Sequence, residues 1–297
     1  MPTAFLPDRG VIRITGEDAL PWLQNIVTSD MSGLKAGEAR YGALLTPQGK
    51  ILYDFIASFG RIAVYPDQPE GVHLDVPRSL AADFARRLAF YKLRAKVRVE
   101  DLSSEDPARE RIGVVAALPG DFVRQEGALT YADPRHPGLG QRGLMPEHDA
   151  LAVSDGEPDD YHARRIALGI PEGGRDFAYG DTFPHEALMD MLGGVDFHKG
   201  CYVGQEVVSR MQHRGTARTR IVPTTFVGEA PAAGTEVRAG EKGLGAMGSS
   251  AKGRGLAMLR LDRAEEAIAA GAPLLAGETA LSLVKPDWWK ATWPHLG

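Results

Sequence analysis

Apolar positions in the first hundred residues follow two periods, one typical of strands and one typical of helices. Residues 10–16 alternate between apolar and other side chains, as a strand does. Leu20, Leu23 and Val27 then recur at helical spacing after an acidic first turn. Gly49 can take the positive φ of a hairpin turn. The elements predicted here are a strand at 10–16, a helix at 17–27, a hairpin of 43–45 and 51–56, a strand at 72–76, a helix at 78–91 and a strand at 96–100.

The pattern changes in the last third of the chain, where short β segments are separated by glycines and prolines. Such segments are typical of a small β-barrel. Gly243, Gly245 and Gly248 lie in this part with no βαβ unit around them, so we interpret them as a barrel turn rather than a nucleotide-binding loop. The predicted elements are helices at 159–169 and 207–213 and β segments at 220–227, 235–238, 256–261 and 281–285.

Composition narrows the class of protein. The 297 residues exceed one compact domain, and 43% hydrophobic with 25% charged residues is ordinary for a folded chain. The net charge of -5 predicts no general attraction to nucleic acid or to an anionic membrane, so we expect neither as a partner. Residues 1–10 lack the order of a signal peptide, and no apolar run approaches the ~20 residues of a membrane span. We therefore expect a cytoplasmic protein.

The chain has one cysteine, Cys201, and its surroundings are the most informative part of the sequence. A single thiol excludes an internal disulfide and any metal site built from several cysteines of one chain, so we predict no metal site. Gly200 and Gly204 predict a tight turn that brings Cys201 close to the start of a helix, where the helix dipole and Lys199 would favour a thiolate. The alternative is a small buried hydrophobe, the commoner fate of a lone cysteine.

Residues 199–206, Lys-Gly-Cys-Tyr-Val-Gly-Gln-Glu, resemble the signature of the YgfZ family, which also includes the mitochondrial factor for maturation of four-iron, four-sulfur proteins. Further blocks match this family in order, and the matches extend over roughly residues 5–265. They lie at residues 22–30, 49–54, 133–135, 165–173 and 183–186.

The resemblance implies an α+β fold of three units like that of the glycine-cleavage T-protein, an aminomethyltransferase, around a central folate tunnel. A discontinuous first domain and a ferredoxin-like second domain would occupy residues 1–218, as the folate-binding region. A C-terminal β-barrel would occupy residues 219–297. The implied ligand is tetrahydrofolate, with its pterin ring in the tunnel and its glutamate tail near the Cys201 loop.

The chain departs from the T-proteins at two positions. They resemble this hairpin but carry two consecutive aspartates where this chain has Tyr53 and Asp54, and they carry a folate-gripping glutamate where it has Ala167. Each lost charged contact should weaken binding by ~1–3 kcal/mol. The resemblance therefore disfavours aminomethyl transfer.

Several site residues keep two interpretations. Asp54 either contacts the pterin or is solvated, Glu186 either contacts folate or caps a helix, and Glu206 either contacts folate or complements a helix dipole. For the carboxylates of the tail we favour Arg220, with Arg218 as its substitute. The predicted folate contacts are Tyr53, Glu186, Lys199, Tyr202, Gln205, Glu206 and Arg220, and the groups predicted to act in the chemistry are Cys201 and Asp54.

The leading hypothesis is a tetrahydrofolate-binding accessory protein in assembly or repair of iron-sulfur clusters, with Cys201 as its reactive group. Its partners would be the iron-sulfur assembly machinery or client proteins. One alternative is a folate-dependent aminomethyl or one-carbon transferase. Another is a folate store in which Cys201 is structural.

Overall fold

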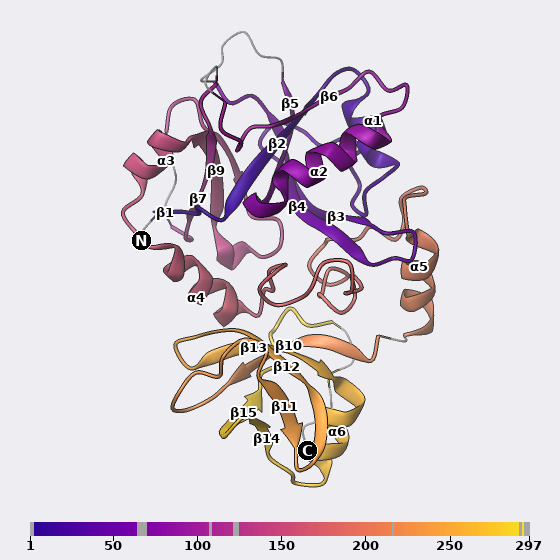
Figure 1. Cartoon of the computed structure of the whole chain (residues 1–297), viewed down its shortest axis with the longest axis vertical. Helices are drawn as coiled ribbons and strands as arrows, with labels where there is room; N and C mark the ends of the chain where they lie inside the picture. Colours follow the sequence, from indigo (N-terminus) through magenta and orange to yellow (C-terminus); the bar gives the residue numbers. More distant parts are fainter. Residues whose placement is uncertain are drawn as a thin grey trace. The chain divides into compact units, whose positions relative to one another are not determined.

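The computed structural model describes residues 3–63, 70–106, 109–120, 125–215, 217–290 and residue 293 (Figure 1). Contacts divide the chain into two compact units. The first comprises Met1–Leu45, Leu52–Tyr161 and Leu192–Val203, and the second comprises Thr46–Ile51, His162–Met191 and Gly204–Gly297.

The first unit holds two sheets. A five-stranded sheet has the order β3-β4-β5-β2-β6, and a four-stranded sheet has the order β1-β7-β9-β8. The elements are β1 (Thr3–Phe5), β2 (Arg9–Thr15), α1 (Ala19–Gln24), β3 (Ala39–Leu45), β4 (Ile51–Gly60), β5 (Gly71–Pro77), α2 (Arg78–Tyr91), β6 (Arg98–Asp101), β7 (Ile112–Ala117), β8 (Leu129–Ala132), the 3-10 helix η1 (Pro137–Leu139), β9 (Gln141–Pro146) and α3 (Glu147–Val153).

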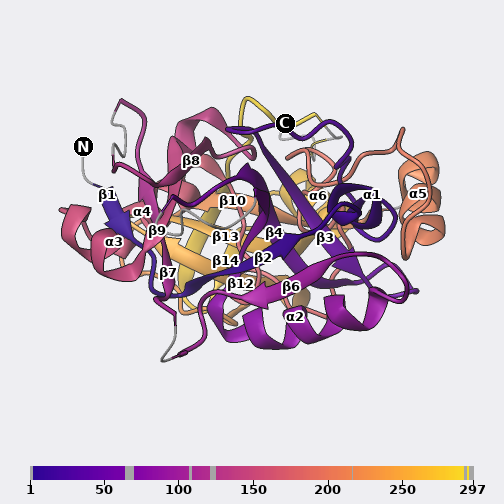
Figure 2. The same ribbon diagram turned by 90° about the horizontal axis from the view of Figure 1, so that it is seen from above.

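One face of the five-stranded sheet forms the apolar core of this unit. Helix α2 lies along β2 and β6 (Figure 2), and its Phe84 and Leu88 are fully buried. Alternate residues of β4 and β5, such as Phe55 and Leu74, face the same cluster. The apolar stripe predicted for residues 78–91 is thus confirmed.

The hairpin predicted around Gly49 is confirmed. The Thr46 amide donates to the Lys50 carbonyl at 2.8 Å, and Gly49 has a φ of +82°. Helix α1 is shorter at both ends than the predicted 17–27, and its first turn holds no acidic residue. Val27 lies outside the helix and forms a β-bridge with Leu44.

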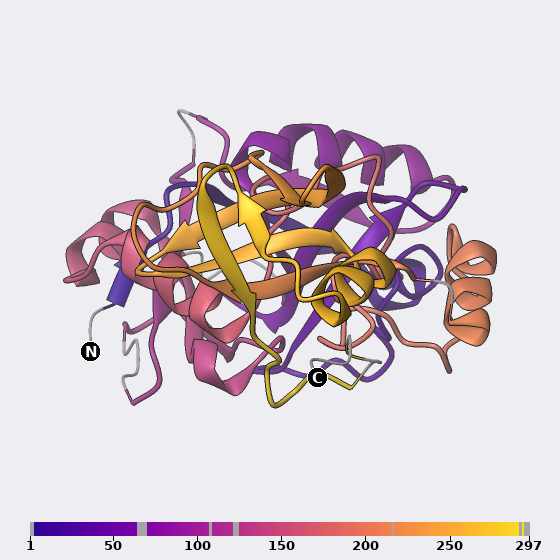
Figure 3. The same ribbon diagram turned by 90° about the horizontal axis from the view of Figure 1, so that it is seen from below.

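The described part of the second unit contains most of α4, the helices α5 and α6, and a closed six-stranded barrel, with α6 beside β13 and β14 (Figure 3). The barrel order is β10-β13-β12-β11-β14-β15. The elements are α4 (Pro158–Leu168), α5 (Gln205–Arg214), β10 (Thr219–Thr225), β11 (Glu236–Ala239), β12 (Lys242–Ala251), β13 (Arg254–Arg260), α6 (Leu261–Ala269), β14 (Leu274–Ala276) and β15 (Thr279–Leu283).

The interpretation of the glycines at 243, 245 and 248 as a turn is wrong, because they lie within strand β12. A Cβ atom at Gly245 would lie 1.8 Å from the Met258 carbonyl oxygen, so glycine is needed where β13 approaches. The register of the two strands also shifts between Met247 and Ser250, as at a bulge.

Helices α2, α4 and α5 match their predictions closely, whereas the pattern of residues did not predict the strands of the four-stranded sheet or helices α3 and α6. Among the described residues, the structure has no helix with both the length and the apolar character that a membrane span requires.

Candidate functional site

Cys201 is exposed, which contradicts its interpretation as a buried hydrophobe. It lies in the segment Leu192–Val203 of the first unit. Gly200 has no positive φ and no neighbour that a Cβ would meet, so the structure gives no steric reason for glycine there. Gly204, by contrast, is the left-handed N-cap of α5, with a φ of +81°.

Hydrogen bonds connect the Cys201 loop to the segment that follows α1. The Thr28 hydroxyl donates to the Gly194 carbonyl at 2.6 Å and accepts from the Ala43 amide at 2.8 Å. The Asp196 amide donates to the Thr28 carbonyl at 2.9 Å. These hydrogen bonds join the block of residues 22–30 to the stretch that leads into the motif of residues 199–206.

Lys199 is part of this fastening. Its ammonium donates to the carbonyls of Val27 at 2.7 Å and Ser29 at 2.8 Å. Burial lowers the pKa of Lys199 to about 8, against the opposing effect of Asp30 and Asp196. The ammonium hydrogen-bonds the loop's own neighbours, so the structure supplies no contact for its predicted roles beside a thiolate or a folate tail.

Tyr202 is buried beside this lysine, with the Lys199 Nζ 5.5 Å from the ring centroid. Its hydroxyl has no hydrogen-bond partner among the described residues. Burial, with a smaller contribution from Asp196, raises the pKa of Tyr202 to about 12, so the hydroxyl keeps its proton.

The last two residues of the motif begin α5 in the second unit. Gln205 is the first residue of the helix. Glu206 lies in its first turn, is largely exposed, and pairs with Arg210 at 2.5 Å. This one-turn pair is a surface interaction of the kind that stabilises a helix modestly.

Tyr53 and Asp54 point to opposite faces of β4, because side chains alternate along a strand. The Tyr53 ring stacks on Phe84 at 4.3 Å and its hydroxyl hydrogen-bonds Asp83. This packing explains Tyr53 without a ligand. Asp54 lies on the other face and is only 4% exposed, so its interpretation as a solvated carboxylate is wrong.

Asp54 belongs to a buried polar network. The Tyr41 hydroxyl donates to its Oδ2 at 3.2 Å, and the Arg135 guanidinium lies 5.8 Å from the Tyr41 ring centroid. Arg135 is held in turn by both oxygens of Asp133, at 3.0 and 2.7 Å. Burial acts to raise the pKa of Asp133, but Arg135 and Arg142 outweigh it and hold that pKa below its usual range.

The network continues across to the four-stranded sheet. Arg142 of β9 donates to Asp133 at 3.1 Å and also hydrogen-bonds Asp75 of β5. Asp75 accepts from Arg9 at 2.7 Å and from Tyr131 at 3.3 Å. Sequence reasoning identified Asp54 but missed the rest of this cluster, for which the sequence signal was the block Asp133-Pro134-Arg135.

Ser58 and His73 lie on the same face as Asp54. They are directly opposed on β4 and β5, and both are buried. The Ser58 hydroxyl and the His73 Nδ1 have no hydrogen-bond partner within the described part of the chain. Burial, with Arg13 nearby, lowers the pKa of His73 to about 3, so the ring is neutral near pH 7. A buried ligand or water with donor and acceptor groups would satisfy both atoms.

In the second unit, Glu186 accepts a hydrogen bond from the Phe183 amide at 2.8 Å. It therefore caps a turn and not a helix, since no helix begins at this point of the chain, so the helix-cap interpretation is wrong. Burial raises the pKa of Glu186 despite that hydrogen bond and nearby Lys50. The Lys50 ammonium lies 3.7 Å from the centroid of the Phe183 ring.

Arg220 is buried, and its guanidinium already hydrogen-bonds other groups of the protein. Its guanidinium donates to both oxygens of Asp190 at 2.9 Å and to the His185 carbonyl at 2.8 Å. It lines a cavity of about 580 Å³ in the second unit together with Arg218, which is exposed. Of the two candidates for a tail carboxylate, Arg218 is thus the more accessible one.

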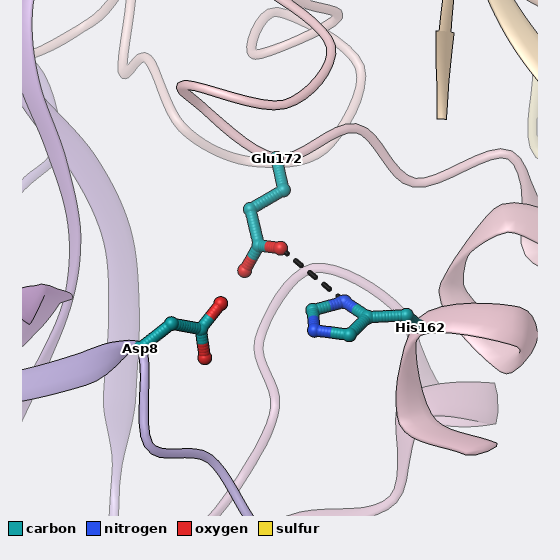
Figure 4. A group of neighbouring side chains, drawn as sticks. All are labelled: Asp8, His162 and Glu172. Carbon is teal, nitrogen blue, oxygen red and sulfur yellow. Dashed lines mark ion pairs between the residues drawn. The ribbon is translucent and has the colours of Figure 1, made fainter. Parts of the chain in front are cut away.

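A histidine and a carboxylate also face each other in the second unit. His162 Nδ1 lies 3.4 Å from the Glu172 carboxylate (Figure 4), which Arg165 and Arg175 also approach, at 3.4 and 3.3 Å. Two guanidinium groups beside the Glu172 carboxylate oppose the binding of a cation. We interpret the pair as structural.

Comparison with known proteins shows which family this chain belongs to. Residues 218–291 match the family model described as the CAF17 C-terminal beta-barrel domain. The chain is 30% identical to the human mitochondrial iron-sulfur cluster assembly factor IBA57 over 310 residues, which cover 96% of this chain and 84% of that protein. It is 32% identical to the mouse protein with the same coverage. The chain belongs to the family of IBA57 iron-sulfur cluster assembly factors.

Other comparisons set the limits of that likeness. The IBA57 homologue of Neurospora crassa is 33% identical over 76% of this chain, but the match spans only 54% of that longer relative. The glycine-cleavage aminomethyltransferase T of Bartonella henselae superposes with a TM-score of 0.72 at 17% identity, over 99% of this chain and 87% of that one. The T-protein-like α+β fold with its closed C-terminal barrel is thereby confirmed.

Proposed function

We propose that this IBA57-family chain is a tetrahydrofolate-binding accessory factor, of the YgfZ type, in assembly or repair of iron-sulfur clusters. Cys201 is its reactive group. Family membership supports the iron-sulfur part, because the relatives described above are named as assembly factors. The exposure of Cys201 on a fastened loop supports the thiol part. Its partners are then the assembly machinery or client proteins.

Tetrahydrofolate fits the polar face of the five-stranded sheet. Asp54, Ser58 and His73 are buried there, and two of them carry polar atoms without a hydrogen-bond partner among the described residues. A pterin has ring N–H groups and acceptors that suit such atoms, and bound tetrahydrofolate would supply a carrier of one-carbon groups. Asp54 would accept hydrogen bonds from the pterin and the other two would complete its contacts.

The other predicted folate contacts differ in the observations that support them. Tyr202 remains a proposed contact because its buried hydroxyl lacks a partner in the described part of the chain. Glu186, Gln205, Glu206 and Arg220 remain proposals without a distinguishing observation. Tyr53 and Lys199 are left out, since packing on Phe84 and hydrogen bonds to two carbonyls account for them.

A folate-dependent aminomethyl or one-carbon transferase is the second candidate. The T-protein-like fold and the retained Asp54 favour it. The tyrosine at position 53 does not replace the missing carboxylate, because its side chain belongs to the apolar core on the opposite face. Turnover of an aminomethyl-lipoyl protein would establish this activity.

Cys201→Ser tests the leading proposal. We expect the variant to bind tetrahydrofolate as the natural protein does and to lose support of a four-iron, four-sulfur enzyme in cells that lack their own copy. A variant that still supports the enzyme would show that Cys201 is not the reactive group. The cytoplasm is the proposed compartment, although the relatives are named mitochondrial, and fractionation with the native host's markers tests it.

A further inference from the structure

The lysine two positions before Cys201 hydrogen-bonds the loop that carries the thiol to another segment of the same unit. Lys199 Nζ donates to the Val27 carbonyl at 2.7 Å and to the Ser29 carbonyl at 2.8 Å. Both acceptors belong to backbone of the segment that follows α1. The long side chain therefore ties the loop to a fixed part of the same unit rather than reaching toward solvent.

The start of the loop is ordered independently. Asp196 Oδ1 accepts from the amides of His198 at 2.7 Å and Lys199 at 3.1 Å. Beyond Lys199, the structure gives Gly200 open space and Cys201 an exposed position. Lys199 is thus the last side chain that fastens the loop before the thiol.

We propose that Lys199 is a positioning residue, whose bridge to the Val27 and Ser29 carbonyls fixes where the exposed thiol of Cys201 is presented. The inference rests on the proposed function only for the importance of that thiol. In this inference Lys199 acts as an anchor that holds the loop through its two hydrogen bonds. It contacts neither the ligand nor the thiolate.

The electrostatic surroundings agree with an anchor. Asp30 and Asp196 both favour the charged ammonium, and the Tyr202 ring lies 5.5 Å from it. Burial opposes the charge and lowers the pKa to about 8, but a neutral amine keeps two N–H groups, enough for both carbonyls. The anchor therefore depends on the presence of donors more than on the charge.

The single cysteine allows a direct measurement, because a nitroxide label attached to the native chain can only report from position 201. We expect its spectrum in the full-length protein to show restricted motion. Lys199→Met keeps the apolar stem and removes the donors, and it should shorten the rotational correlation time by roughly twofold or more. Lys199→Arg should restore restriction, since it again offers N–H groups.

His198→Ala is the matched control, since that neighbouring side chain is exposed and only its amide joins the Asp196 turn. It should leave the spectrum unchanged. Calorimetry with tetrahydrofolate separates the roles: an anchor predicts that Lys199→Met binds it within about twofold of the natural protein.

Two results would overturn the inference. One is a freely mobile label in the natural sequence, which needs no variant to fold. The other is an unchanged spectrum in Lys199→Met, and an added loss of folate affinity of about tenfold or more would make Lys199 a ligand contact. Failure of folate to bind at all would refute the proposed function but leave the label measurement decisive for the anchor.

Discussion

Both faces of the five-stranded sheet in the first unit are buried, but they are built from opposite kinds of side chain. One face packs Phe55 and Leu74 against Phe84 of α2. The other presents Asp54 and Asp75, within hydrogen-bond reach of tyrosines and arginines. Apolar packing alone stabilises the first face, whereas a polar face can be buried only if its charges are paired. We infer that the second face is retained for function.

The largest expected effect comes from breaking the polar face. Arg142→Met would leave Asp75 and Asp133 buried with fewer partners, and we expect a loss of about 3–5 kcal/mol in the free energy of unfolding, measured in urea. Phe84→Ala is the counterpart on the apolar face, with a cost of about 3–5 kcal/mol. Arg86→Met, in an exposed pair with Asp83, should cost under about 1 kcal/mol. An Arg142→Met loss as small as that of Arg86→Met would show that the network is not stabilising.

The apolar face could be predicted from the sequence, because its signal is local. Alternation in residues 10–16 and the stripe of residues 78–91 both identified side chains that are buried in the core. The polar face could not, since Asp54 on a hairpin looks solvated until a second sheet covers it. That sheet brings Arg142, 67 positions from Asp75, and its strand β8 has only four residues.

For the candidate site, as for the sheet, the sequence predicted the local features but not the contacts between distant segments. The motif around Cys201 identified the exposed thiol, but the partners of Lys199 lie about 170 positions away, at Val27 and Ser29. Spacing along the chain carries no signal for such contacts. The placement of the domain boundary at 218/219 stays a prediction.

A smaller effect concerns the pH dependence of stability, to which the buried His73 of the polar face contributes. The pKa of His73 is lowered to about 3 by burial and by Arg13, while an unfolded histidine titrates near ~6.5. Between these values the unfolded chain binds a proton that the folded chain does not, so stability falls as pH falls from about 6.5 toward 3.

His73→Gln should remove this contribution, which has a maximum slope of about 1.4 kcal/mol per pH unit. Urea unfolding between about pH 4.5 and 7 measures it. The exposed His198→Gln is the control and should keep the slope of the natural protein. Parallel curves for His73→Gln and the natural protein would rule out a buried neutral His73.

The smallest expected effect on stability comes from removing one tyrosine hydroxyl from the polar face. The same variant tests whether that face binds folate. Tyr41→Phe removes the hydroxyl that donates to Asp54 at 3.2 Å, and we expect it to cost about 1–2 kcal/mol of stability and to weaken tetrahydrofolate binding about threefold to tenfold. Tyr131→Phe removes an equivalent buried hydroxyl from Asp75 and should cost similar stability without changing affinity. Equal affinity losses in the two variants would mean that Asp54 has no special place in binding.

The central claim, that the polar face holds a folate, is tested most directly by calorimetric titration of the full-length protein with tetrahydrofolate. The account predicts a micromolar dissociation constant, about -8 kcal/mol, for the natural protein. Asp54→Asn should weaken binding about tenfold or more, while Asp83→Asn, which alters the Tyr53 contact on the apolar side, should bind as the natural protein does. No binding at millimolar tetrahydrofolate, or an Asp54→Asn variant that binds undiminished, would contradict it.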